Sequence, residues 1–160
     1  MAALTVYEQL LLELVNRARL DPAGEAARFG ISLNAGLAAG TLTSTAKQAL
    51  APNEFIVGSA RAHSQWMIDK DIFSHTGVGG SSPGDRMGTA GYAFTGSWTW
   101  GENIAWSRTT GTPNLLSYTN ELHQNLFLSP GHRVNILAAQ YPQLGTAIVS
   151  GPLKSGTATS

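Results

Sequence analysis

Two long stretches of this sequence repeat their apolar residues with the period of an α-helix, and they constrain the fold more than any other feature. Over residues 6–20, apolar side chains recur every three or four positions, and Thr5 and Glu8 form the T-x-x-E pattern of a capping box. Residues 54–71 carry a second stripe of this kind. Because an amphipathic helix must bury its apolar face against other elements, the sequence predicts a packed domain with helices around its core.

Shorter elements are predicted from turn and cap residues. Asp21 and Ser82 are each followed by proline, which is typical of a helix start, and the helix after Ser82 is expected to end at Gly91. The other predicted elements are a long loop over 30–53, helices over 112–128 and 130–138, and strands over 103–107 and 144–150. These helices and strands do not alternate in the regular way that indicates a parallel sheet, so an α+β sandwich fits best. Neither repeats nor linkers appear, which indicates one domain.

The composition excludes several classes of protein. The chain has 160 residues, of which 42% are apolar, so it is long enough to bury a core without disulfides. Ten acidic and ten basic residues cancel, which leaves no basic field for a nucleic acid. The sequence has no cysteine, and this excludes disulfides, thiolate metal sites and cysteine nucleophiles.

The hydropathy pattern bears on location. No run approaches the roughly 18 apolar residues of a membrane span. Glu8 and Glu13 interrupt the first fifteen residues, and no basic segment precedes them, so this start is not a signal peptide. The residues alone leave two alternatives open: a cytosolic protein, or a secreted one whose leader is absent from this sequence.

Three residues are the first candidates for chemistry. His132 lies in the first turn of a predicted helix, where the helix dipole disfavours a charged imidazole. His75 precedes a glycine-rich loop, and Glu102 precedes a predicted buried strand, so its carboxylate is expected to need a partner. Two imidazoles and one carboxylate suit zinc with an open water position. They suit general acid–base catalysis or a purely structural hydrogen-bond network equally well, and the spacing does not choose between these.

The remaining candidates have structural explanations. His63 falls on an apolar helical stripe and is predicted to be a hydrogen-bonded core residue, whereas His123 is predicted to be exposed on the helix over 112–128. Residues 80–84 match the G-x-S-x-G pattern of a serine hydrolase. That motif needs a strand before the serine, but a glycine-rich loop precedes it here. Ser82 is therefore interpreted as a helix cap.

Several segments, taken together, resemble the CAP superfamily, which comprises cysteine-rich secretory proteins, antigen 5 and pathogenesis-related-1 proteins and whose domain is also called the SCP domain. The three most specific segments read FSHTG at residues 73–77, GENIA at 101–105 and SPGHRVNIL at 129–137. Supporting segments are AHSQWM at 62–67, SSPGDRM at 81–87 and AGY at 90–92. They follow the order of the bacterial branch and span about residues 5–150.

This resemblance implies a three-layer α-β-α sandwich with a central, mostly antiparallel sheet. It also implies a cleft in which two histidines and two glutamates can hold a divalent metal such as zinc. By motif, His75, Glu102 and His132 match three of these four residues. The second glutamate is where the chain departs from the family, since Ser129 stands at or near its position and Glu121 is a poor substitute.

For function, the resemblance implies a secreted, extracellular binding module that holds zinc or another divalent metal and a small apolar or lipid ligand. The alternatives are a metal-dependent hydrolase of peptide or cell-wall substrates, with Glu102 polarising water, and a metal-free scaffold. Residues 1–160 are expected to form a single, monomeric domain with its core over 5–150, cut from a longer secreted protein. Its partner is expected to be a small ligand or an extracellular or cell-wall component and not a nucleic acid, and no membrane span is expected.

Overall fold

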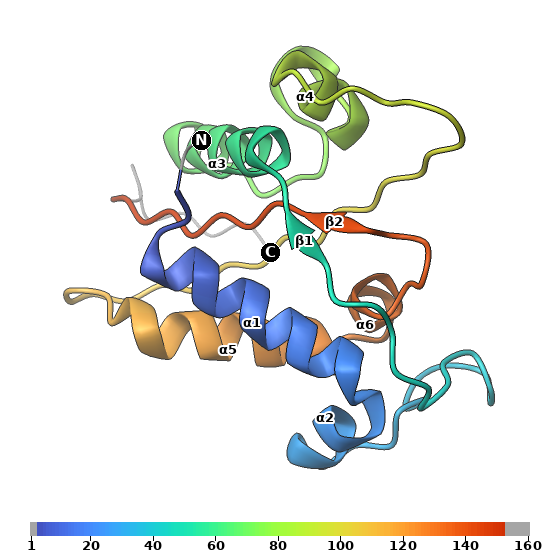
Figure 1. The fold of residues 1–160 in the computed structure, drawn as a ribbon. Helices are drawn as coiled ribbons and strands as arrows, with labels where there is room; N and C mark the ends of the chain where they lie inside the picture. The colour runs from blue at the N-terminus through green and yellow to red at the C-terminus, as the bar shows by residue number, and fades with distance from the viewer. Residues whose placement is uncertain (1–2, 153–160) are drawn as a thin grey trace.

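The computed structural model describes residues 3–152, and most of their regular structure is helical (Figure 1). The α-helices are α1 (Val6–Leu20), α2 (Pro22–Arg28), α3 (Glu54–Lys70), α4 (Pro83–Thr89), α5 (Leu115–Leu128) and α6 (Pro130–Ile136), with a short 3-10 helix at Val78–Gly80. The strands are β1 (Ala51–Pro52) and β2 (Gln143–Leu144). The helices lie where the cap residues and the apolar periodicity predict them.

The predicted helix starts are confirmed in atomic detail. At α1, the Thr5 hydroxyl accepts a hydrogen bond from the Glu8 backbone at 3.2 Å, and the Glu8 carboxylate accepts one from the Thr5 backbone at 2.7 Å. Ser82 and Asp85 form the same reciprocal pair at α4, which confirms Ser82 as a cap. That helix ends at Thr89, two residues before the predicted Gly91.

The helices form two groups with extended chain between them (Figure 1). In one group, α1 packs along α5, and α2 and α6 flank this pair. In the other group, α3 packs against α4. The main apolar cluster lies in the first group and consists of Val15, Ala18, Ala26, Leu42, Leu50, Phe127, Ile136 and Leu137.

The predicted three-layer sandwich around a mostly antiparallel sheet is wrong. Within residues 3–152, the sheet consists of β1 and β2, which are two residues long and parallel, with Ala51 opposite Gln143 and Pro52 opposite Leu144. Of the predicted strand over 144–150, only Leu144 is in a strand, and the segment 103–107 is extended without strand pairing. The helices are therefore separated by extended segments and not by a sheet.

Contacts with helices replace the expected strand pairing. A Cβ on Gly145 would overlap the backbone of Ile56, so this residue allows the chain to run directly against α3. The Thr146 hydroxyl donates a hydrogen bond to the Glu8 carbonyl of α1 at 3.0 Å. Asn103 is held by side-chain hydrogen bonds to α6. These segments have the composition of strands, but they make their contacts with helices instead of with other strands. Their composition alone does not reveal this.

A buried arginine joins α1 to the C-terminal half of the chain. The Arg19 side chain is fully buried and donates to the carbonyls of Gln48, Ile136 and Ala138 at 2.7–2.8 Å. These carbonyls lie outside regular pairing, so the guanidinium satisfies backbone groups that would otherwise be left without partners.

No helix among residues 3–152 is long and apolar enough to cross a membrane.

Candidate functional site

The first half of the candidate site is a chain of side-chain contacts from His75 through Glu102 to Arg86. His75 Nδ1 lies 2.9 Å from Glu102 Oε1, and Arg86 donates to Glu102 Oε2 at 2.5 Å. Arg86 also donates to the backbone carbonyl of His75 at 3.0 Å. Because a carboxylate accepts and the hydrogen must sit on the ring nitrogen, Nδ1 of His75 carries a hydrogen, and the tautomer that this contact selects has its lone pair on Nε2.

The second half of the site is His132 on α6. Its Nδ1 lies 2.8 Å from the Ser129 hydroxyl. Burial lowers the pKa of His132, and the nearby His75 lowers it further. The His132 ring is therefore neutral at neutral pH, in agreement with the expectation from its place in the first turn of a helix.

The residue after Glu102 joins the two halves. The side-chain amide of Asn103 donates to the backbone carbonyl of His132 at 3.2 Å, and the side-chain amide of Asn135 donates to Asn103 Oδ1 at 2.9 Å. Gly101 makes this approach possible, since a Cβ there would overlap the Asn135 side chain. Glu102 and Asn103 are adjacent in the chain, and they contact His75 and the backbone of His132, respectively.

The two imidazoles open onto one hollow of about 510 Å³. His75, Glu102, Ser129 and His132 all contribute to its wall. A second cavity, of about 230 Å³ and with largely apolar walls, lies next to it between the two helical groups. Six residues line both spaces: Trp100, Gly101, Glu102, Asn103, Asn135 and Tyr141.

The two imidazoles at the open hollow are the candidate donors for a metal ion. Residues 3–152 contain no group of three or more His, Cys, Asp or Glu side chains arranged to hold a metal ion. Both Glu102 oxygens are already engaged by His75 and Arg86. The Nε2 atoms of His75 and His132 are then the candidate donors, provided that Nδ1 of His132 donates to Ser129. Carboxylate-oriented histidine is the usual arrangement behind a metal-bound imidazole.

The structure brings most of the predicted site residues together. His75, Glu102 and His132 line one hollow, and Ser129, at the position of the missing glutamate, contacts His132 directly. Glu121 is exposed and accepts a hydrogen bond from the Ser107 hydroxyl at 3.3 Å, outside the described wall of the hollow.

The other two histidines are both buried. His63 is 3% exposed and bonded to the Ser74 carbonyl, which confirms the prediction of a core residue. The prediction that His123 is exposed is wrong, because it is 1% exposed and its Nε2 lies 2.7 Å from Glu25 Oε1. His123 shares the buried face of α5 with Phe127, four residues later. That spacing was the available signal for burial.

The sequence did not single out Arg86, which holds the site together. Its side chain is 8% exposed, and it donates to the carbonyls of His75 and Ser81 as well as to Glu102. The signal for it is chemical: a partly desolvated glutamate needs a cation, and the chain has ten Lys and Arg residues to supply one.

The profile of the Cysteine-rich secretory protein (CAP) family matches residues 12–158, which is most of the chain. The chain belongs to the CAP family. It is also 36% identical over 106 residues to the uncharacterized protein YkwD of Bacillus subtilis (strain 168). That match covers 64% of this chain and 37% of YkwD, so this CAP domain corresponds to well under half the length of its relative. No solved structure matches this sequence significantly.

Proposed function

We propose that this CAP domain is an extracellular binding module that takes a small ligand in the hollow between His75 and His132, with a divalent metal such as zinc held by the two imidazoles. One observation carries the proposal. The Glu102 carboxylate accepts from Nδ1 of His75, which selects the tautomer with its lone pair on Nε2, and the neutral imidazole of His132 lines the same hollow.

Each side chain has a defined task in this proposal. Glu102 orients His75, and Arg86 in turn fixes Glu102 from its other oxygen. Ser129 orients His132 through Nδ1. When bound, the metal supplies open coordination positions for a donor atom of the ligand, and two protein ligands leave more such positions than a closed structural site does.

A hydrolase remains the alternative, and Glu102 is its predicted water-activating residue. Both oxygens of Glu102 accept hydrogen bonds from other side chains of the site. In this arrangement the carboxylate orients His75 and does not have an oxygen free of side-chain partners for a water. The contacts therefore favour binding over hydrolysis.

The location and the partner complete the proposal. An extracellular setting is supported by membership of a family named for secreted proteins. The low charge of the chain and a described wall of the hollow that includes Glu102 but neither Lys nor Arg favour a small ligand or a wall component over a nucleic acid.

Zinc binding by tag-free protein tests the proposal. Zinc should raise the melting temperature of the wild type, and His75→Ala or His132→Ala should abolish the rise, because each removes one of two donors. Glu121→Gln is the matched control, since it changes an exposed carboxylate outside the described wall of the hollow and should leave the rise intact. An equal rise in the histidine variants would refute the metal site.

A further inference from the structure

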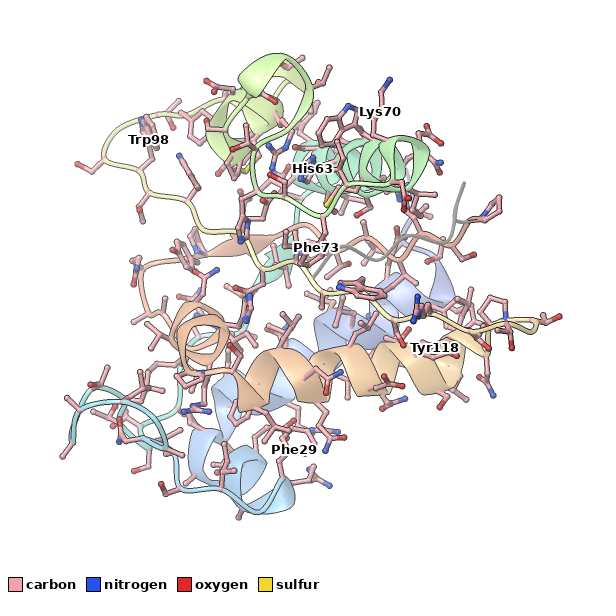
Figure 2. All side chains as sticks on the ribbon, turned by 180° about the vertical axis from the view of Figure 1, so that it is seen from behind. Phe29, His63, Lys70, Phe73, Trp98 and Tyr118 are labelled. Carbon is pink, nitrogen blue, oxygen red and sulfur yellow. The ribbon has the colours of Figure 1, made fainter. Side chains whose placement is uncertain are left out.

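The loop that follows α4 carries two tryptophans with a large share of their surface exposed. Trp98, labelled in Figure 2, is 56% exposed, and Trp100 is 38% exposed. Apolar residues that are exposed singly are common on proteins, whereas large apolar side chains that form one surface mark an interaction site. The contacts of these two tryptophans decide which case applies.

Trp98 is the outer member of a row of three aromatic rings. Its ring centroid lies 4.5 Å from that of Phe94, and Phe94 meets Tyr92 edge-on at 4.9 Å. The Tyr92 hydroxyl donates a hydrogen bond to the Gln143 side chain of β2 at 3.0 Å. The exposed indole therefore rests on half-buried rings that are anchored to the rest of the protein, and it is preorganised for a partner.

Two glycines on one face of α4 give room for these rings. Gly84 and Gly88 are four residues apart, and such residues lie on the same side of a helix. A Cβ on Gly84 would lie 2.6 Å from Trp100 Nε1, and one on Gly88 would lie 4.0 Å from the Phe94 ring. Trp100 and Phe94 thus pack along the same side of α4. We call Phe94, Trp98 and Trp100 the aromatic strip.

One end of the aromatic strip belongs to the candidate site. Trp100 lines the hollow of about 510 Å³ together with His75 and Glu102. Trp98 is part of the described wall of neither cavity. The strip therefore provides a binding surface that begins at the hollow and continues outside it.

The residues beside the indoles indicate the kind of partner. Thr95, Ser97 and Thr99 are exposed, and residues 92–105 contain neither Lys nor Arg. A membrane surface favours basic side chains, and protein interfaces are depleted in serine. Exposed aromatic rings next to hydroxyls match instead a molecule with apolar C–H faces and a rim of hydroxyls, which is the chemistry of a sugar ring.

We propose that the aromatic strip binds a neutral, β-linked polysaccharide, with the C–H face of one pyranose ring stacked on Trp98 and that of another on Trp100. The ring substituents of β-linked glucose or N-acetylglucosamine are equatorial, so the axial C–H bonds form flat faces. Their hydrogens are weakly positive and meet the negative face of an indole. The inference deepens the wall-component part of the proposed function and does not rest on the metal.

Isothermal titration calorimetry of the EDTA-treated domain with hexasaccharides tests the proposal. Cellohexaose and chitohexaose are β-linked and should bind about tenfold more tightly, or better, than maltohexaose, whose α-linked chain is curved. Trp98→Ala and Trp100→Ala should each weaken cellohexaose by about tenfold or more. Trp106→Ala is the matched control, because Trp106 is 57% exposed but is not a member of the strip, and it should leave the affinity unchanged. Absence of binding by both β-linked probes would overturn the proposal.

Two further substitutions at Trp98 separate stacking from plain apolar contact. Trp98→Phe keeps an aromatic face and should retain part of the affinity, whereas Trp98→Leu keeps an apolar side chain without such a face and should bind as weakly as Trp98→Ala. Wild-type affinity in Trp98→Leu would overturn the stacking. Circular dichroism checks the fold, and the wild-type comparison of cellohexaose with maltohexaose decides the question even if a variant does not fold.

A second copy of the chain is the competing occupant of the strip. If sedimentation velocity shows a dimer that Trp98→Ala abolishes, and neither β-linked probe binds, the strip is an interface between copies and the proposal is wrong.

The zinc measurement keeps this inference apart from the proposed metal. Trp98→Ala should keep the zinc-induced rise in melting temperature, because Trp98 lies outside the described wall of the hollow. If cellohexaose binds as expected and zinc has no effect, the metal fails alone. If zinc acts and neither β-linked probe binds, the assignment of the aromatic strip fails alone.

Discussion

Glu25 is the residue at which one substitution tests the electrostatics of the core. Its side chain is 1% exposed, and it ties α2 to α1 and α5. His123 Nε2 lies 2.7 Å from Oε1, while Arg17 donates to both oxygens at 2.6 and 2.8 Å. Burial by itself would raise the pKa of Glu25, but the hydrogen bonds from His123 and Arg17 and the charge of Arg17 hold it at about 2.

The loss of stability expected on replacing Glu25 follows from this pKa. The difference between the ordinary value of 4.5 and about 2 corresponds to about 3 kcal/mol of stability. The folded-state pKa is depressed, so this stability is fully present above pH 4.5 and is lost as the pH falls towards 2. Glu25→Gln should therefore lower the free energy of unfolding by about 3 kcal/mol at pH 7, and the difference from the wild type should shrink below pH 4.5.

Urea unfolding followed by circular dichroism at several values of pH measures this difference. Glu13→Gln is the control, because Glu13 is exposed on α1, where its carboxylate accepts a hydrogen bond from the Gln9 side chain. It should change stability by less than about 0.5 kcal/mol at any pH. A deficit in Glu25→Gln that is as large near pH 2.5 as at pH 7 would show that packing, and not ionisation, is responsible.

Substitutions at four further positions test other contacts. Thr5→Ala removes the cap of α1 and should cost about 1 kcal/mol in urea unfolding, whereas Thr5→Ser should cost less. Arg19→Met leaves three carbonyls unpaired and should lower the free energy of unfolding by about 3 kcal/mol or more by the same measurement. Gly145→Ala forces the chain away from α3 and should lower the free energy of unfolding by about 1–3 kcal/mol in the same titration. Arg86→Gln frees Glu102 and should weaken zinc binding by about 10- to 100-fold in calorimetry, with the fold checked by circular dichroism.

The helices could be predicted because their signals are local. The capping boxes at Thr5 and Ser82 and the proline after Asp21 each act within one turn, and all of them form as expected. A strand needs a partner that the segment itself does not specify. The segment 144–150 has the composition of a strand, yet its partners are α3 and α1, reached through Gly145 and Thr146. The sheet was therefore the part of the fold that local reasoning got wrong.

The burial of a polar residue could be predicted only where the local sequence pattern indicated it. His63 lies on a visible apolar stripe and was correctly placed in the core. His123 has a local signal in Phe127 four residues later, but it was misplaced because its partner, Glu25, is 98 residues away on a short helix whose packing the sequence does not reveal. A buried ionisable residue becomes plausible only once its partner is known, since an unpaired one is strongly disfavoured.

In the candidate site, too, local sequence signals identified residues but not the long-range contacts between them. His75, Glu102 and His132 were found through motifs, and these report residue identity but not the contacts that orient a side chain. Arg86 and Asn103 supply those contacts from two directions, one from α4 to Glu102 and the other from the extended segment to the His132 backbone. Because the two imidazoles are carried by different segments that line one hollow, these contacts help to hold the two segments in place. A substitution at Arg86 or Asn103 keeps both histidines but disturbs the contacts that orient them. Such a substitution should therefore alter ligand binding strongly.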